Sequence, residues 1–352
     1  MDLLLCGASA FRYWRTPPQI LALYPPLPQL FEDSNHRKLA SCDLVQDILG
    51  APLYRAAFAP GQNSSTKLYV TQTFKNGLPP SSVQNTEHGF TITSPAATLL
   101  TMAKNISQEH LLLVLYEMLG AFTVFNPCKR AERVLEAALT QGFLRPTEGW
   151  HRVKNVDGHG TDLWKRSPLV TIEELEVFCE HAAGFHGVKK LRWAIEHVSG
   201  CTASPFEGQT STLLSLPRAA GGEGMVIKNN QRIPLSPAAR SIYPHEACFA
   251  DILIESSGDN AGVVLECQGR SVHASEAAGI LDSNRTTALN TMGYEVILVT
   301  YDQIANRRSF QAVLDIIARK TGVRRRAKTP RQLQAEEALR REIFIDWNTL
   351  GS

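Results

Sequence analysis

Two carboxylates and an amide lie in a pair of short apolar segments in the last third of the sequence. Asp251 stands near the start of the segment 249–255, and Glu266 and Gln268 stand late in the segment 262–268. β-branched and aromatic residues cluster in these segments, and the polar sequence SSGDNAG separates them, so we expect two strands joined by a turn. Residues two apart on a strand share a face, which places Glu266 beside Gln268. A hairpin can bring Asp251 close to Glu266.

These oxygen-bearing side chains are suited to a hard divalent cation. Mg²⁺ takes oxygen ligands and keeps several waters, and Mn²⁺ accepts ligands of the same kind. A cation held by Asp251 and Glu266 would lower the pKa of bound water and stabilise charge on a phosphoryl group under attack. The pattern therefore predicts a magnesium or manganese site.

Glu266 also breaks the local pattern, because it interrupts the apolar sequence VVLECQG. A buried carboxylate is costly unless it is paired or bound to a metal. The alternative is that Asp251 and Glu266 face solvent on an edge strand. Side chains on opposite faces of the sheet would exclude a shared metal.

The elements that must position these residues can be predicted from periodicity and capping signals. In order they are a helix over 204–216, a strand over 225–235, the two hairpin strands, a helix over 275–292, a strand over 294–300 and a helix over 308–320. The run YEVILVT is typical of a strand buried on both faces. The order α-β-β-β-α-β-α indicates an α/β fold with a central mixed sheet flanked by helices.

Four segments between about residue 188 and residue 305 carry a resemblance to a known family. They are LRWAIEHVSGCTASPFEGQTSTLL, ADILIE, LECQGRSVH and DSNRTTALNTMGYEVILVT. In this order they resemble the nuclease-like domain related to very-short-patch-repair endonucleases, within the PD-(D/E)XK superfamily. The resemblance implies a restriction-endonuclease-like α-β-β-β-α-β domain. It also implies a DNA endonuclease that hydrolyses phosphodiester bonds with Mg²⁺ or Mn²⁺.

The resemblance assigns roles to four residues of the predicted metal site. Asp251 and Glu266 match the metal-binding positions, and Glu207 matches an acidic helix position that can supply a further ligand. Gln268 stands where the superfamily usually has a lysine. Glutamine can orient the attacking water but brings no charge. Glu207 also has a structural alternative, since it stands three residues after Ser204, the spacing of a capping box.

His273 and Arg285 complete the set implied by the resemblance. His273 would act as an acid, a base or a phosphate donor, although the same residue could simply begin a helix. Arg285 would reach a DNA phosphate. Alternatively, Arg285 pairs with Asp282, three residues earlier on the same helix.

Gln268 keeps a second hypothesis open. In it, the domain is a nuclease fold without catalysis, and the protein binds DNA or acts as a regulator in a toxin–antitoxin or defence system. The retained pair of Asp251 and Glu266 favours the enzyme, because an inactive site has no physical need for both. A third interpretation, a protein–protein module, predicts no affinity for metal or DNA.

A basic segment follows the nuclease-like region. Residues 319–331 hold seven basic residues and no acidic one. Clustered cations of this kind contact phosphates without regard to sequence, so we expect DNA contacts from Arg324, Arg325, Arg326 and Lys328. The alternative is a solvated linker. A charged helix is predicted over 332–344.

Residues 1–185 are predicted to form a mainly helical module with a few strands. The predicted helices cover 94–104, 107–122, 129–141 and 171–183, and the predicted strands cover 67–74 and 89–93. The segments CGASAFRYWRTPP and TSPAATLLTMAKN resemble parts of AbiEi-type antitoxin and regulator proteins. The apolar stretch 111–122 is too short to cross a bilayer and contains Glu117, so a buried helix is expected there.

Length and composition limit the number of domains and the class of protein. The chain has 352 residues, of which 43% are hydrophobic and 20% charged, enough for more than one core. We expect parts at 1–185, 186–320 and 321–352. The net charge of +2 does not indicate a nucleic-acid partner by itself. Seven scattered cysteines without a Cys-x-x-Cys pair, and no basic signal sequence, favour a soluble cytoplasmic protein without a membrane partner.

Overall fold

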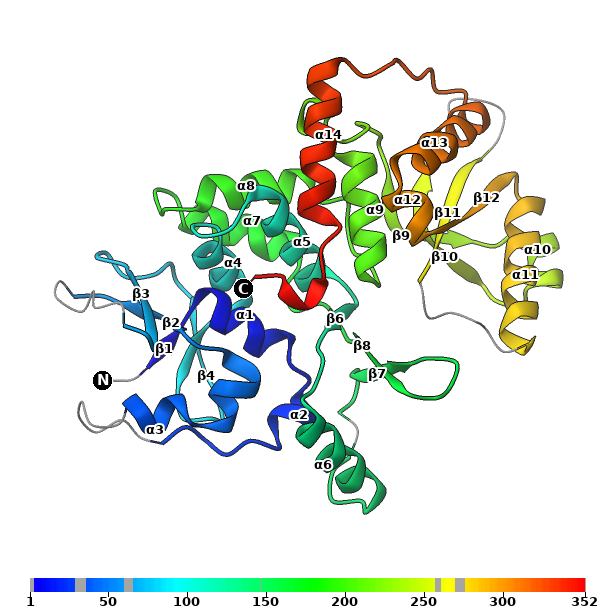
Figure 1. Ribbon diagram of the computed structural model, residues 1–352. Coiled ribbons are helices and arrows are strands. Elements are labelled where there is room, and N and C mark those ends of the chain that lie inside the picture. Colours follow the sequence, from blue (N-terminus) through cyan, green and yellow to red (C-terminus); the bar gives the residue numbers. More distant parts are fainter. Residues whose placement is uncertain are drawn as a thin grey trace. The chain divides into compact units, whose positions relative to one another are not determined.

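The computed structural model describes residues 3–28, 36–59, 66–145, 147–256, 261–269 and 276–351. The fold is α/β with mixed sheets, as predicted (Figure 1). The chain divides into two compact units. Unit 1 comprises Met1–Val153, Asp162–Glu196 and Asp346–Ser352, and unit 2 comprises Lys154–Thr161 and His197–Ile345.

These boundaries differ from the predicted ones. Unit 1 continues to Glu196 instead of ending at 185, because helix α8 (Val188–His197) is anchored there by Lys190, whose Nζ donates to the Ile106 carbonyl at 2.6 Å. The segment 321–352 is not a separate part. Its helix α14 (Pro330–Ile343) packs against α9 (Pro205–Ser215) in unit 2, and its last residues belong to unit 1.

Unit 1 contains more strands than the sequence indicated. Its larger sheet has the order β3 (Tyr69–Thr73), β2 (Leu53–Ala57), β1 (Leu4–Leu5), β5 (Thr91–Thr93) and β4 (Val83–Asn85). A second sheet has the order β6 (Phe122–Val124), β8 (Gly160–Lys165) and β7 (His151–Lys154). β3 and β5 were predicted. Among the missed strands, β4 is exposed at every position and has no apolar alternation.

Besides α8, the described part of unit 1 has four helices close to the predicted ranges 94–104, 107–122, 129–141 and 171–183, and four near the N-terminus that were not predicted. They are α1 (Gly7–Arg15), α2 (Pro18–Leu21), α3 (His36–Ala40), the π-helix η2 (Val45–Leu49), α4 (Pro95–Met102), α5 (Gln108–Leu119), α6 (Lys129–Thr140) and α7 (Ile172–His181). The hydroxyls of Ser94 and Ser107 accept hydrogen bonds from the first turns of α4 and α5. The predicted helix 107–122 is too long, since α5 ends at Leu119 and Phe122 already begins β6.

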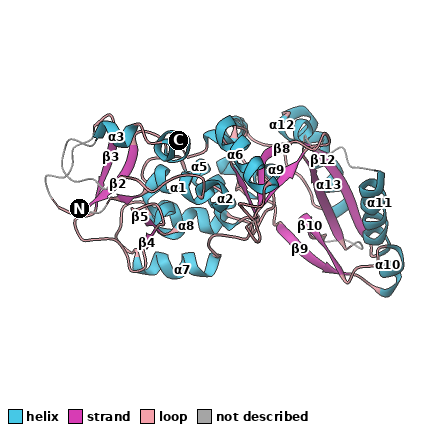
Figure 2. Cartoon of the chain, turned by 90° about the horizontal axis from the view of Figure 1, so that it is seen from below, coloured by secondary structure: helices cyan, strands magenta, loops and turns pink. Residues whose placement is uncertain are grey.

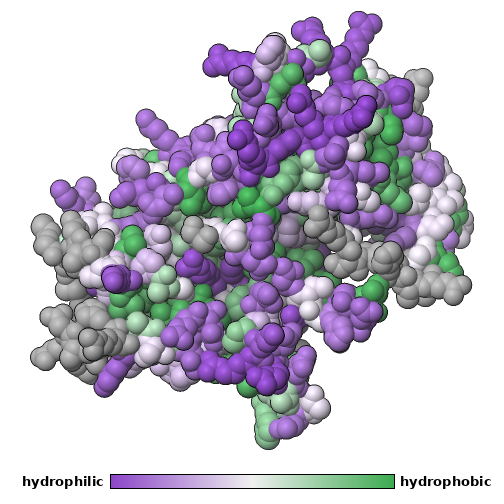
Figure 3. Space-filling model, viewed as in Figure 1, coloured by the Kyte–Doolittle hydropathy of each residue, from purple (hydrophilic) through white to green (hydrophobic). Residues whose placement is uncertain are grey.

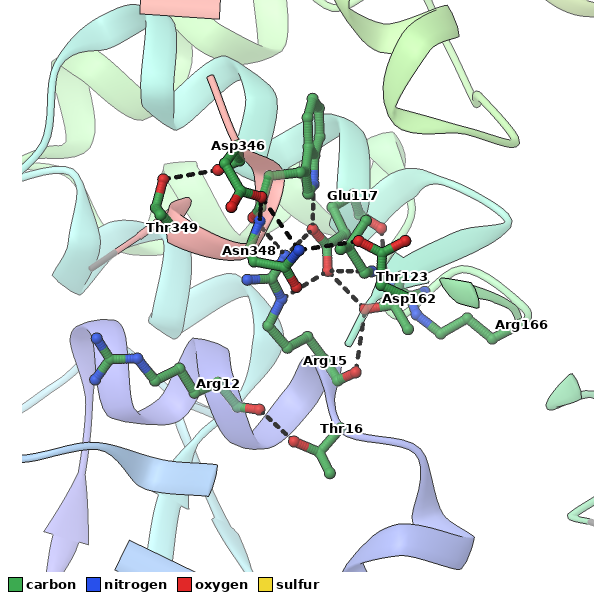
Figure 4. A network of polar contacts seen from close by, with 12 residues as sticks. Arg12, Arg15, Thr16, Glu117, Thr123, Asp162, Arg166, Asp346, Asn348 and Thr349 are labelled. Carbon is green, nitrogen blue, oxygen red and sulfur yellow. Dashed lines mark hydrogen bonds and ion pairs between the residues drawn. The ribbon is translucent and has the colours of Figure 1, made fainter. Parts of the chain in front are cut away.

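Helix α5 is buried along its length, as its apolar sequence predicted. Every residue from Leu111 to Leu119 is buried, including Glu117. Figure 4 shows Arg15 from α1 directed at the Glu117 carboxylate, with contacts of 3.0 and 2.7 Å. Thr123 donates to the same carboxylate at 2.6 Å, and the indole Nε1 of Trp347 donates at 2.5 Å. Within the described residues, none of the helices is sufficiently long and apolar to cross a membrane.

Unit 2 is built on a mixed sheet in the order β12 (Tyr294–Thr300), β11 (Gly262–Gln268), β10 (Ala247–Ile254) and β9 (Lys228–Pro234) (Figure 2). β10 is antiparallel to both β9 and β11, whereas β11 and β12 run parallel. The parallel pair is joined by helix α11 (Glu276–Thr291), as such a crossover requires. The predicted order α-β-β-β-α-β-α is confirmed, with a short helix α10 (Pro237–Ile242) added between β9 and β10.

Helices cover both faces of β11. Val264 packs in a cluster with Ala288 and Leu289 of α11, whereas helix α13 (Arg307–Thr321) also packs against this strand. Val264 and its neighbour Leu265 are both 0% exposed. Consecutive strand residues point to opposite faces, so both faces are covered at this point. The short helix α12 (Tyr301–Ala305) connects β12 to α13.

The prediction that residues 294–300 form a strand buried on both faces was wrong. β12 lies at the edge of the sheet, and Leu298 is 53% exposed although its neighbour Val299 is 0% exposed. The apolar run therefore has one covered side and one partly open side. The open side contributes Val296 and Leu298 to the pocket described below.

Candidate functional site

A pocket of about 590 Å³ in unit 2 is lined by residues of β10, β11, β12 and the helix α11. Its lining includes Asp251 from β10, Glu266 and Gln268 from β11, and Asp282 and Arg285 from α11. Four residues that the sequence suggested for one site, namely Asp251, Glu266, Gln268 and Arg285, are therefore brought together. The geometry that would exclude a shared metal, with the two carboxylates on opposite faces, is not found.

The strand ladder is interrupted where Asp251 enters the pocket. Paired positions of β9 and β10 continue on both sides of Asp251 but omit it, and the facing residue Asn230 has a φ of 47°. A positive φ is uncommon for a residue other than glycine. On the other side, the backbone N–H of Cys267 donates to Asp251 Oδ2 at 2.8 Å. The carboxylate of Asp251 thus accepts a β11 backbone donor beside Glu266.

Glu266 is held by a cation and repelled by an anion. Its side chain is 13% exposed, and its Oε1 lies 2.7 Å from Nη2 of Arg285. The same Nη2 also donates to the carbonyl of Phe249. Burial, together with the charge of Asp251, outweighs Arg285 and raises the pKa of Glu266 to about 8. The two carboxylates therefore form an electrostatically coupled pair that favours a bound cation.

Arg285 does not pair with Asp282, the partner that helical spacing suggested. It reaches across the pocket to Glu266 on β11 instead. Asp282 lines the same pocket and is exposed. Asp282 was expected only as an alternative partner of Arg285, and its position in the pocket lining was not predicted.

Glu207 is committed to the start of its own helix. Its carboxylate oxygens accept hydrogen bonds from the Ala203 N–H at 2.7 Å and from the Ser204 hydroxyl at 2.8 Å. The Ser204 hydroxyl in turn accepts from the Glu207 N–H. Glu207 does not line the pocket. Its oxygens cap α9, yet its charge also helps to raise the pKa of Glu266, so its role as a further metal ligand stays a prediction.

The pocket matches a cation site that is only partly built by protein. Within the described ranges no group of three or more His, Cys, Asp or Glu side chains is spaced to hold a metal ion. Mg²⁺, however, is often held by one or two carboxylates together with waters and substrate phosphate oxygens. Asp251 and Glu266 fit that smaller donor set. His273 lies outside the described residues.

Comparisons of this chain with protein-family models, with curated proteins and with solved structures found no match. The functional argument therefore depends on the residues of the pocket themselves.

Cys267 is not a candidate nucleophile. Burial, followed by the charge of Asp251, raises the pKa of its thiol well above the ordinary value. The thiol therefore stays protonated, although Cys267 is half-buried and lines the pocket.

The basic segment divides into buried and exposed cations. The side chain of Lys328 is 4% exposed, and its Nζ lies 2.8 Å from Glu223 and 2.9 Å from Glu336. Its predicted role as a DNA contact conflicts with this burial, because two carboxylates already compensate its charge. Arg325 forms an ion pair with Asp315.

Arg324 and Arg326 are exposed and stay predicted phosphate contacts. Hydrophilic residues dominate the surface around α14, which follows this segment (Figure 3). The basic segment is therefore anchored at Arg325 and Lys328, whereas Arg324 and Arg326 are exposed.

Proposed function

We propose that unit 2 is a divalent-metal-dependent endonuclease domain that hydrolyses phosphodiester bonds in DNA. The observation that carries the proposal is that Asp251 and Glu266 line one pocket, where Asp251 helps to raise the pKa of Glu266 to about 8. Two carboxylates that destabilise each other need a cation or a proton between them. A structural role offers no reason to keep both.

The arrangement of the sheet supports the same proposal. The α-β-β-β-α-β order, with an antiparallel hairpin followed by a parallel crossover, agrees with what the resemblance to PD-(D/E)XK nucleases implies. Asp251 and Glu266 lie on the neighbouring antiparallel strands of that hairpin. The resemblance assigns its metal-binding residues to the same two strands.

Individual residues of the pocket suit distinct tasks. Asp251 and Glu266 would hold Mg²⁺ or Mn²⁺, which when bound would lower the pKa of water and stabilise phosphoryl charge. The exposed amide of Gln268 can orient a water molecule by hydrogen bonding but adds no charge. Arg285 is the cation among the described lining residues, and its planar guanidinium matches phosphate oxygens.

A second candidate function is DNA binding without catalysis. In the conformation described, Arg285 forms an ion pair with Glu266, and Gln268 stands where the superfamily usually has a lysine. Both observations favour a DNA-binding or regulatory protein of a toxin–antitoxin or defence system. Exposed Arg324 and Arg326 serve either function, because phosphate contacts are independent of catalysis.

The test is cleavage of supercoiled plasmid and short duplexes with Mg²⁺ or Mn²⁺. Wild type is compared with Asp251→Asn and Glu266→Gln, which keep side-chain size but remove the charge, and with the corresponding alanine variants. Glu337→Gln is the matched control, since Glu337 is 69% exposed on α14. We expect metal-dependent cutting that both pocket variants lose, by about 100-fold or more, and that the control retains. Wild type that binds DNA without cutting it would favour the second candidate.

A further inference from the structure

The guanidinium of Arg285 lies where a metal ion bound to Oε1 of Glu266 would lie. Its Nη2 lies 2.7 Å from Glu266 Oε1, and Glu266 is one of the two carboxylates suited to a metal ion. A divalent ion on this oxygen and a guanidinium in the same place would repel each other strongly at such a distance. Metal binding at Oε1 of Glu266 therefore requires that Arg285 move.

Arg285 cannot leave Glu266 at no cost. Its side chain is only 23% exposed, so a guanidinium without an acceptor would be poorly solvated. The pocket of about 590 Å³ beside it has room for an incoming group. In the free protein Arg285 donates to the Glu266 carboxylate and to the Phe249 carbonyl, and only the first of these acceptors carries a compensating charge.

We propose that Arg285 exchanges partners, from the Glu266 carboxylate in the free protein to a DNA phosphate when a divalent cation takes its place on Glu266. This inference rests on the proposed function and adds its regulation. The cation releases Arg285, and the phosphate gives the released guanidinium a new acceptor. Each ligand thereby removes part of the cost of binding the other. Metal and DNA must then bind cooperatively, and the coupling is reciprocal.

The exchange makes Arg285 a positioning residue with a measurable thermodynamic signature. If Arg285 only supported the structure of the pocket, its loss would weaken metal binding and DNA binding independently of each other. A residue that exchanges partners links the two, so its loss removes the coupling rather than only the affinities. Removing Arg285 should also ease cation binding in the absence of DNA, because Glu266 is then free.

The experiment measures coupling without relying on cleavage. The affinity for a fluorescent short duplex with phosphorothioate linkages is measured by anisotropy at constant ionic strength, with and without Mn²⁺. Mn²⁺ affinity of the free protein is measured by calorimetry. Variants are Arg285→Gln and Arg285→Lys. The matched control is Arg308→Gln, which removes the same charge from an exposed position on α13 that does not line the pocket.

We expect Mn²⁺ to tighten DNA binding about tenfold in wild type and in Arg308→Gln, within the usual range of coupling. In Arg285→Gln the tightening should fall to about twofold or less, while Mn²⁺ alone binds more tightly than to wild type. Arg285→Lys should show intermediate coupling, because lysine keeps the charge without the planar fork.

Three outcomes would overturn the inference, and only the third also removes the proposed function. Mn²⁺ binding by wild type with no effect on DNA affinity, or coupling that persists in Arg285→Gln, removes the partner exchange and leaves the proposed function intact. Wild type that binds no Mn²⁺ removes both. If Arg285→Gln does not fold, absence of coupling in wild type still refutes the inference, and the reduced coupling expected in Arg285→Lys still tests the role of Arg285.

Discussion

Two glutamate–arginine pairs, one in each unit, have the same closest contact and different surroundings. In unit 1 the Nη2 of Arg15 lies 2.7 Å from Glu117, and the two side chains are 6% and 0% exposed. In unit 2 the Nη2 of Arg285 lies 2.7 Å from Glu266, and the two side chains are 23% and 13% exposed. The contact distance therefore does not distinguish a structural pair from a functional one.

The remaining partners of each carboxylate make the distinction. Glu117 receives two donors from Arg15, the hydroxyl of Thr123, the N–H of Val124 and the indole of Trp347. A buried network with every acceptor satisfied makes the core rigid. Glu266 instead faces the charge of Asp251, which together with burial raises its pKa. A strained charge that lines a pocket is typical of a functional site.

The largest effect is expected when each of the two glutamates, Glu117 and Glu266, is replaced by glutamine. Glu117→Gln leaves the buried Arg15 without its counter-charge, and we expect a loss of about 3–5 kcal/mol in the free energy of unfolding. Glu266→Gln relieves the repulsion by Asp251 while it weakens the pair with Arg285. We expect these effects to offset each other to within about 1 kcal/mol. Urea unfolding of wild type and the two variants measures both changes in the free energy of unfolding.

Equal destabilisation by the two substitutions would contradict the distinction. It would mean that Glu266, like Glu117, holds its unit together. Glu337→Gln serves as the control, because its ion pair with Arg341 is exposed and should contribute little.

The sequence was most informative where local rules decide the structure. The limits of β11 and β12 were predicted residue for residue, because both are apolar runs bounded by turn signals. The start of α9 followed from Ser204, whose hydroxyl caps it as expected. Adjacent antiparallel strands then brought Asp251 near Glu266, since a short turn leaves few other ways to pair them.

The sequence was least informative where partners come from distant elements. The spacing of Asp282 and Arg285 suggested a pair within one helix, but Glu266 from the sheet is the stronger acceptor for a guanidinium on that face. Lys328 was read as an exposed cation because its neighbours are basic. Its buried position depends on Glu223 and Glu336, which lie far from each other along the chain. No local pattern contains that information.

A second test concerns Glu336, a buried carboxylate of unit 2 outside the pocket. Burial alone would raise its pKa, but hydrogen bonds from Lys328 and Arg340 outweigh burial and lower it. A carboxyl group with a depressed folded-state pKa stabilises the protein above its unfolded value of about 4.3. That stability is lost as the pH falls through the lower folded-state value.

We therefore expect Glu336→Gln to cost about 2 kcal/mol near neutral pH. The difference from wild type should narrow in acid, because wild type then loses the same interaction. Urea unfolding at neutral and acidic pH tests this. A difference that stays constant or widens in acid would show that Glu336 acts through packing. Glu336 would then differ from Glu117, a buried carboxylate that is stabilised by its hydrogen-bond donors.

The smallest effect is expected for Trp347→Phe, which tests how far the hydrogen bonds to Glu117 depend on one another. Trp347→Phe removes the 2.5 Å indole hydrogen bond to Glu117 and keeps most of the apolar ring that packs near Phe122. Glu117 would keep its contacts with Arg15 and Thr123, so we expect a loss of only about 1 kcal/mol in urea unfolding. In the background of Glu117→Gln the same substitution should cost clearly less, since the charge that strengthens the bond is gone. Equal costs in both backgrounds would mean that Trp347 stabilises unit 1 by packing alone. The network around Glu117 would then be less cooperative than its geometry indicates.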